Sequence, residues 1–254
     1  MFSRRANGNP FVKQTLVTSM ERCVHCGEGL AEETRDHVFP ASWYPLTTPS
    51  EVERWTVPSC RKCNCTLGKK EKELFIRLAM CVDPRKAEAA GLSAKAMRSM
   101  GIGAEGLSVK ERWHRRALKL KVMASMWRYE PGTPTFPGFG LHRGFPTDEQ
   151  IAINIPSNLL QEVAKKIVRG CEYRLASRVI EEPYVVKVYF VHSENVPELV
   201  VRAFQTAGAQ TTQLGPGFRV TRVTAHDEPN SAIYKIIIWK TLVIYASILP
   251  DRED

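Results

Sequence analysis

Four of the seven cysteines form two C-x-x-C pairs, Cys23 with Cys26 and Cys60 with Cys63. In such a pair the backbone turns so that both thiolates face one centre, and two pairs give the tetrahedral sulfur set that structural zinc prefers. From Cys26 to Cys60 the pairs stand 34 positions apart, which is longer than a minimal zinc ribbon. We therefore expect a structural Zn²⁺ site with a further element inserted between its two halves.

Other interpretations of these cysteines stay open. Four reduced thiols without a metal also fit a reducing compartment, whereas a redox C-x-x-C would need a βαβ setting that the flanking residues do not provide. His25 lies inside the first pair and offers a competing ligand, but we expect it to be a solvated turn residue. The remaining cysteines have no partner spacing and are expected to be core or inert thiols: Cys65, Cys81 and Cys171.

Asp36 and His37 lie between the two pairs, and Asn64 directly follows the second. A histidine near its ordinary pKa of about 6.5 accepts a proton from water at neutral pH. Carboxylate and amide oxygens suit hard Mg²⁺ or borderline Mn²⁺, and such an ion neutralises charge that develops during phosphodiester hydrolysis. These residue types therefore indicate metal-assisted hydrolysis, although a polar turn and a helix N-cap at Asn64 explain them equally well in isolation.

The sequences DHVFP, VPSCRKCN and GKKEKEL, framed by the cysteine pairs, together resemble the HNH endonucleases of the ββα-metal class over about residues 20–80. The resemblance implies a DNA endonuclease in which His37 is the general base and Asp36 and Asn64 hold a catalytic Mg²⁺ or Mn²⁺. It also implies a bend at Asp36 and His37, because neighbours in a regular strand face opposite sides. The zinc would then hold the strand after Thr34 against the helix that Asn64 opens.

The chain departs from that family at one position. The family usually carries an asparagine before the second cysteine pair that helps to orient the histidine, but no asparagine lies between His37 and Asn64. Trp55 falls at the usual position, and we expect its backbone carbonyl to orient His37 while the indole packs beneath. The departure supports one alternative, a zinc-containing module that binds nucleic acid without cutting it. A second alternative is a protein-interaction scaffold whose C-terminal part carries the function.

Basic residues give a formal net charge of +9 and a pI of about 9.3, which favours a polyanionic partner. They cluster around the second cysteine pair and along a later helix, in which Trp113, Leu118, Val122 and Met126 are expected to form a buried stripe. A solvated basic face is the other interpretation of both clusters. The residues expected to contact nucleic acid, DNA above all, are Arg61, Lys62, Lys69, Lys70, Arg112, Arg115, Arg116 and Lys119.

Composition and hydropathy narrow the class of protein. Hydrophobic residues make up 43% and charged residues 25%, so the chain should bury a core and not stay disordered. No stretch approaches the roughly 20 apolar residues of a membrane helix, and no apolar core follows the two N-terminal arginines. We therefore expect a cytoplasmic protein without membrane association.

The helices and strands expected along the chain predict an α+β protein. Residues 1–82 are expected to hold short extended segments and one helix, which together form the zinc-stabilised ββα-metal module. Residues 83–130 are expected to form a basic helical extension that contains a helix over about 109–128. A Pro- and Gly-rich linker is expected at 131–146. The remaining residues, 147–254, are expected to form a C-terminal α+β domain, and three roles stay open for it: dimerising the chain, reading a DNA sequence, or binding a partner protein.

Periodicity predicts the elements of that last part. Apolar residues at helical spacing indicate a helix over 158–177 with Ser157 as its cap, and β-branched and aromatic residues indicate a strand over 184–191. Two similar runs within 231–249 predict either a hairpin around Lys240 and Thr241 or one long bent strand.

Overall fold

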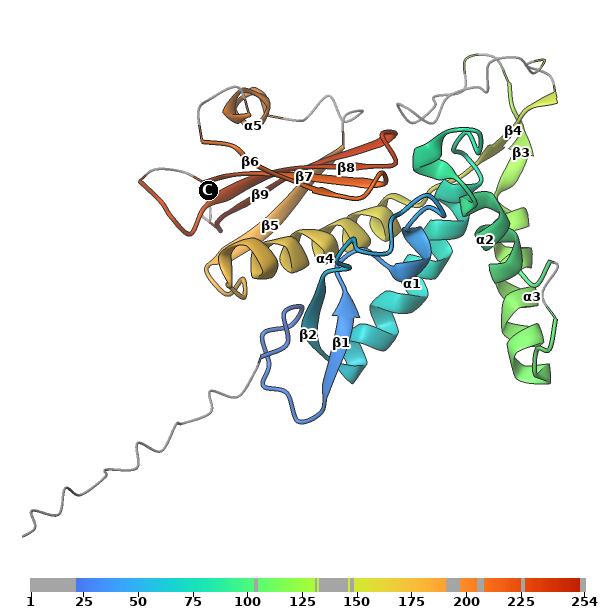
Figure 1. Ribbon diagram of the computed structural model, residues 1–254, viewed down its shortest axis with the longest axis horizontal. Coiled ribbons are helices and arrows are strands. Elements are labelled where there is room, and N and C mark those ends of the chain that lie inside the picture. Colours follow the sequence, from blue (N-terminus) through green and yellow to red (C-terminus); the bar gives the residue numbers. More distant parts are fainter. Residues whose placement is uncertain are drawn as a thin grey trace, which may run out of the picture.

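The computed structural model describes residues 22–102, 105–130, 132, 146, 149–190, 197–204, 208–224 and 227–251. The chain combines helices with sheets in which every strand pair is antiparallel, which is consistent with the predicted α+β class. Helix α4 (Ser157–Ala176) lies between a five-stranded sheet and the N-terminal elements (Figure 1). In the part of the chain that is described, no helix is both long and apolar enough to cross a membrane.

The N-terminal elements are two strands and a helix. Strand β1 (Glu33–His37) pairs antiparallel with β2 (Thr56–Cys60), and α1 (Arg61–Ala79) follows β2 without a break. A short 3-10 helix, η1 (Ala41–Trp43), lies in the connection between the strands. The predicted order of extended segments followed by one helix is confirmed.

The helical extension is shorter than predicted. It contains the 3-10 helix η2 (Ala87–Ala89) and the helices α2 (Leu92–Ser99) and α3 (Val109–Met123). The single helix expected over 109–128 ends at Met123, and β3 (Met126–Arg128) then pairs antiparallel with β4 (Ile151–Ile153). Pairing with a distant segment therefore overrides the local helical pattern at the end of this stretch.

One member of the stripe predicted along α3 is not buried. Val122 is fully buried, and Leu118 and Met126 are partly buried against the core, as predicted. Trp113, however, is 67% exposed, because the described elements leave this side of the helix uncovered. The α3 surface thus presents an aromatic side chain among its basic residues.

The C-terminal elements are α4 and a sheet in the order β5-β9-β8-β7-β6, with every neighbouring pair antiparallel. Side chains of β8 alternate between buried and half-buried positions, as expected for a sheet with one face on the core. The elements after α4 are β5 (Tyr184–Phe190), α5 (Glu198–Ala203), β6 (Gln210–Leu214), β7 (Phe218–Thr224), β8 (Ala232–Ile238) and β9 (Leu242–Pro250).

Most of these elements match the predictions. The helix expected over 158–177 is confirmed to within one residue, but Ser157 is its first helical residue, and the N-cap is Pro156, which makes no side-chain cap. The strand from residue 184 is confirmed as far as Phe190. Of the two possibilities for 231–249 the hairpin is correct, because β8 and β9 pair through a turn at residues 239–241.

A single hydrophobic core joins the N-terminal elements to the sheet. The rings of Phe39 and Phe218 stack with centroids 4.3 Å apart, and the Trp239 indole donates to the Trp43 carbonyl at 2.8 Å. Trp239 and Lys240 have φ values of 52° and 54°, because they are the central residues of the tight turn that joins β8 to β9, and such hairpin turns need left-handed backbone at both positions. The linker predicted at 131–146 lies outside the described residues, except for 132 and 146.

A buried carboxylate on α4 connects this helix to the sheet. The Glu172 side chain is fully buried and accepts hydrogen bonds from Arg178, Arg222 and the Tyr234 hydroxyl. Burial acts to raise the pKa of Glu172, but the hydrogen bonds from Arg222 and Tyr234 and the charge of Arg222 outweigh it. The pKa therefore lies below its ordinary value, and Glu172 is ionised in the folded protein at neutral pH.

We expect the fold to lose stability in acid through Glu172. Because the folded pKa is depressed, its stabilisation is complete above the unfolded pKa of about 4.3 and is lost as the pH falls through the folded value. Glu172→Gln should lower the free energy of unfolding at neutral pH by roughly 3 kcal/mol, because two arginines lose a buried partner. It should also flatten the acid dependence of thermal unfolding between about pH 7 and pH 3.

The control is Glu198→Gln, which removes an exposed ion pair with Arg202 on α5. That substitution should change the free energy of unfolding by less than about 1 kcal/mol. If Glu172→Gln keeps the wild-type acid dependence, another carboxylate governs it.

Candidate metal centre and polar site

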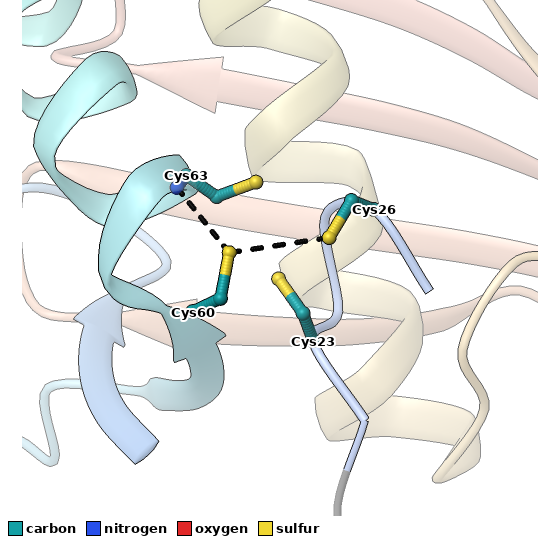
Figure 2. A group of neighbouring side chains, drawn as sticks. All are labelled: Cys23, Cys26, Cys60 and Cys63. Carbon is teal, nitrogen blue, oxygen red and sulfur yellow. Dashed lines mark hydrogen bonds between the residues drawn. The ribbon is translucent and has the colours of Figure 1, made fainter. Parts of the chain in front are cut away.

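The two cysteine pairs meet at one point (Figure 2). The Sγ atoms of Cys23, Cys26, Cys60 and Cys63 all lie within 4.8 Å of one another. Sulfurs around a tetrahedral zinc, each about 2.3 Å from the metal, are about 3.8 Å apart. The predicted ligand set is therefore compatible with a zinc site, and it is the one such cluster of cysteine, histidine and carboxylate groups in the described chain.

Local backbone geometry aims these thiols at one another. The first pair lies in a tight turn, in which the Gly27 N–H donates to the Cys23 carbonyl at 2.8 Å and Gly27 adopts a φ of 76°. In the second pair, Cys60 ends β2 and caps α1, because its thiol accepts a hydrogen bond from the Cys63 N–H. The cluster thus joins the first turn of the described chain to the junction of β2 and α1.

The thiols differ in how readily they ionise. Burial acts against the Cys23 thiolate, yet backbone hydrogen bonds from Cys60, Cys26 and His25 lower its pKa to about 7. Burial and the neighbouring cysteines raise the pKa of Cys63. A bound divalent cation would offset the repulsion between neighbouring thiolates and hold all four sulfurs in the thiolate form.

Asp36 is a buried carboxylate with two partners. Its Oδ2 lies 2.8 Å from His25 Nε2 and 3.3 Å from Lys166 Nζ, and its side chain is only 6% exposed. Burial acts to raise the pKa of Asp36, but the hydrogen bond from His25 and the charge of Lys166 hold the pKa below its ordinary value. Asp36 is thus ionised at neutral pH, and no described residue donates a hydrogen bond to its Oδ1.

The expectation that His25 is a solvated turn residue is wrong. Its side chain is 2% exposed and reaches Asp36, because the first cysteine turn lies against β2 through a bond from the Val24 N–H to the Pro58 carbonyl. Burial lowers the pKa of His25, and the charge of Lys166 adds to this effect, although Asp36 opposes it. His25 is therefore a neutral donor to Asp36 at neutral pH.

The bend expected at Asp36 and His37 lies one residue later. Both residues belong to β1 and pair with Val57 and Thr56 of β2, and the chain bends at Val38. The hydrogen-bonded ladder keeps the pair extended, so consecutive side chains leave opposite faces of the ribbon.

His37 itself is half-buried, and its Nδ1 has no hydrogen-bond partner in the described part of the chain. Burial lowers the pKa of His37, the nearby Lys166 charge lowers it further, and the opposing effect of Asp36 is smaller. The ring is therefore neutral at pH 7, the form that can accept a proton.

Trp55 does not orient the His37 ring as expected. Its carbonyl accepts a hydrogen bond from the Val38 N–H at 2.9 Å, so it fixes the backbone that follows His37. The indole is 6% exposed, and the Arg174 guanidinium lies 5.8 Å from the ring centre. Trp55 therefore acts through the main chain and through packing.

Asn64 contacts β1 from the first turns of α1. It is the fourth residue of the helix, so the alternative role of N-cap falls to Cys60. Its Nδ2 donates to Thr34 Oγ1 at 3.0 Å, which leaves Oδ1 as the free end of the amide. Thr34 and Asp36 are two residues apart in a strand and share one face, so Asn64 lies on the face that carries Asp36.

The basic residues predicted to contact nucleic acid divide into two groups. Lys70 forms an ion pair with Glu162, and Arg115 donates to the Arg98 carbonyl at 2.5 Å, so intramolecular contacts engage both. Lys119 is half-buried. The exposed members are Arg61, Lys62, Lys69, Arg112 and Arg116, of which Arg61 makes a long 3.9 Å contact with Glu32.

Two residues of the site were not predicted. Lys166 of α4 is fully buried beside Asp36, and Glu71 of α1 lies within ion-pair distance of the same ammonium, at 2.6 Å.

Comparison of the chain with protein-family models, curated proteins and solved structures finds no match. The interpretation of the site therefore depends on its own residues and their contacts.

We expect Cys60→Ser to lower zinc content and stability together. Serine keeps the N-cap of α1, so the loss would come from the missing thiolate and not from the helix end. Zinc per chain, measured by elemental analysis, should fall well below one, and the unfolding temperature should fall with it.

Cys65→Ser provides the matched control, because Cys65 is an exposed residue of the same helix outside the cluster. That variant should keep both zinc and stability. A Cys60→Ser protein that retains the wild-type unfolding temperature without zinc would rule out a structural metal.

Proposed function

We propose that this protein is a metal-dependent endonuclease that hydrolyses phosphodiester bonds in DNA. The proposal depends on one short unit in which β1, β2 and α1 follow one another and the cysteine cluster lies at the β2–α1 junction. In this unit Asn64 bonds to the face of β1 that carries Asp36, and His37, the last residue of the strand, leaves the opposite face. Order, spacing and residue types resemble those of the HNH endonucleases.

Asp36 and Asn64 have the donor types that a hard divalent ion such as Mg²⁺ or Mn²⁺ requires. The low pKa of Asp36 supplies a carboxylate, and its contacts with His25 and Lys166 engage Oδ2, while Oδ1 accepts no bond from the described residues. The Asn64 amide nitrogen is engaged by Thr34, so its oxygen faces away from that bond. When bound, the ion would neutralise charge on the phosphate and on the departing oxygen.

His37 would act as the general base. Its lowered pKa keeps the imidazole neutral at pH 7, so the ring can accept the proton that a water molecule loses as its oxygen attacks phosphorus. The phosphorus–oxygen bond opposite the attacking water then breaks, and the departing oxygen takes a proton from solvent. This step needs a base beside the scissile phosphate but no covalent intermediate with the protein.

Exposed basic side chains would hold the DNA backbone. Arg61, Lys62 and Lys69 lie on α1, the helix that carries Asn64, and Arg112 and Arg116 lie on α3. Contacts of this kind attach to phosphates and carry no sequence information of their own. The formal net charge of +9 adds long-range attraction for the polyanion.

One observation favours a second candidate function, a zinc module that binds nucleic acid without cutting it. The Asp36 side chain is 6% exposed and already has two partners, His25 and Lys166. A carboxylate in such surroundings can serve the fold alone. Binding of DNA without cleavage in Mg²⁺ or Mn²⁺ would favour this candidate over the nuclease.

We expect His37→Ala to reduce nicking of supercoiled plasmid DNA in Mg²⁺ by at least about 100-fold, because general-base catalysis contributes roughly 10²- to 10⁴-fold. Zinc content and unfolding temperature should stay at wild-type values. The matched control is His114→Ala, since His114 is an exposed histidine of α3. Undiminished cleavage by His37→Ala would remove the histidine from the mechanism.

The basic face of α3 gives a separate prediction about binding. The double variant Arg112→Glu/Arg116→Glu should weaken DNA affinity and flatten its salt dependence, because each lost phosphate contact lowers the slope of log K against log salt by about 0.9. Fluorescence anisotropy at several salt concentrations measures both quantities. Lys187→Glu, on β5 of the sheet, changes the charge of an exposed residue elsewhere and should leave the slope closer to wild type.

A further inference from the structure

We infer that Lys166 of α4 is a positioning residue of the candidate site, whose buried ammonium holds the Asp36 carboxylate and the backbone at His37 in place. The inference deepens the proposed function and rests on it for the activity measurement. It also makes the site composite, because α4 belongs to the C-terminal half of the chain.

The surroundings of the Lys166 ammonium consist of four oxygens from the site. Nζ lies 3.3 Å from Asp36 Oδ2, 2.6 Å from Glu71 Oε1 and 3.3 Å from the Val38 carbonyl, and it also donates to the His37 carbonyl. The side chain is fully buried. A buried ammonium without partners is strongly unfavourable, so these oxygens are what make a lysine tolerable at this position.

The contacts converge on the main chain where His37 ends β1. Lys166 bonds the carbonyls of His37 and Val38, and the Trp55 carbonyl bonds the Val38 N–H at 2.9 Å. The peptide after His37 is thus held from two sides, whereas Nδ1 of the His37 ring has no described partner. The direction of the ring therefore depends on the backbone that Lys166 fixes.

The approach of α4 to β1 is unusually close. Gly170 lies one helical turn after Lys166, and a Cβ atom at this position would come within 2.8 Å of Val38 Cγ2. One segment of α4 therefore supplies both the cation beside Asp36 and the glycine that lets the helix approach.

A charge-balanced variant separates positioning from stability. Lys166→Met alone leaves Asp36 and Glu71 as two uncompensated carboxylates, and it should destabilise the fold. Lys166→Met/Glu71→Gln removes one charge of each sign, so the net charge of the cluster stays the same, and zinc content and unfolding temperature should return toward wild type. If Lys166 positions the site, kcat for plasmid cleavage should remain about 10- to 100-fold low with KM unchanged, because misplacement of catalytic groups acts on the chemical step.

Two single variants complete the series. Glu71→Gln keeps Lys166 and should retain more of kcat than the double variant, and Lys165→Met removes the neighbouring, partly exposed lysine of α4 without an effect. Recovery of the wild-type kcat in the stable double variant would show that Lys166 acts on stability alone, and it would overturn the inference.

Failure of the proposed function gives a different result. If the wild-type protein does not cleave DNA in Mg²⁺ or Mn²⁺, the nuclease proposal is lost, and the inference is decided by NMR of histidine-labelled, zinc-loaded protein. In the double variant the ring signals of His37 should shift or broaden, while those of exposed His114 stay fixed. Unchanged His37 signals would overturn the role of Lys166.

Discussion

A carboxylate withdrawn from water needs partners, and Asp36 takes its partners from two segments that are far apart in the sequence. His25 reaches it from the first cysteine turn, and Lys166 reaches it from α4. Each contact is possible only if a separate part of the chain packs against β1. The Asp36 charge thereby connects the cysteine turn, the β1–β2 ribbon and the C-terminal helix, and loss of any one of them leaves it incompletely compensated.

The cysteine cluster and α4 are complementary supports for a weak element. A two-stranded ribbon alone is at best marginally stable in water. The cluster holds one end of the ribbon, where Cys60 ends β2, and α4 packs against the other end, where Gly170 meets Val38. The residues of the candidate site lie between these two supports, so the geometry of Asp36 and His37 depends on both the cysteine cluster and the C-terminal half.

The sequence predicted those features whose signals are local. Paired C-x-x-C spacing identified all four thiols, apolar residues at helical spacing identified α4, and β-branched and aromatic residues identified β5, because turn geometry and local residue preferences act over a few residues. The contact between Lys166 and the His37 carbonyl spans 129 positions, and no local pattern encodes such a pairing. A partial signal was present, since Lys166 interrupts a helical row of otherwise apolar or small residues, Leu159, Val163 and Gly170. Trp113 illustrates the converse, because an apolar residue at helical spacing does not reveal whether anything covers it.

Under the proposed function, the same ammonium governs how a divalent ion would bind. Asp36 would be shared between Lys166 on Oδ2 and the ion on Oδ1, and the repulsion between the two cations is poorly screened because the lysine is fully buried. Glu71 offsets part of this repulsion, since it contributes a second negative charge beside the ammonium. An excess of positive charge remains. A bound phosphate would neutralise it, because phosphate oxygens are both anionic and good ligands for Mg²⁺. A site built in this way would favour binding of ion and DNA together over binding of the ion alone.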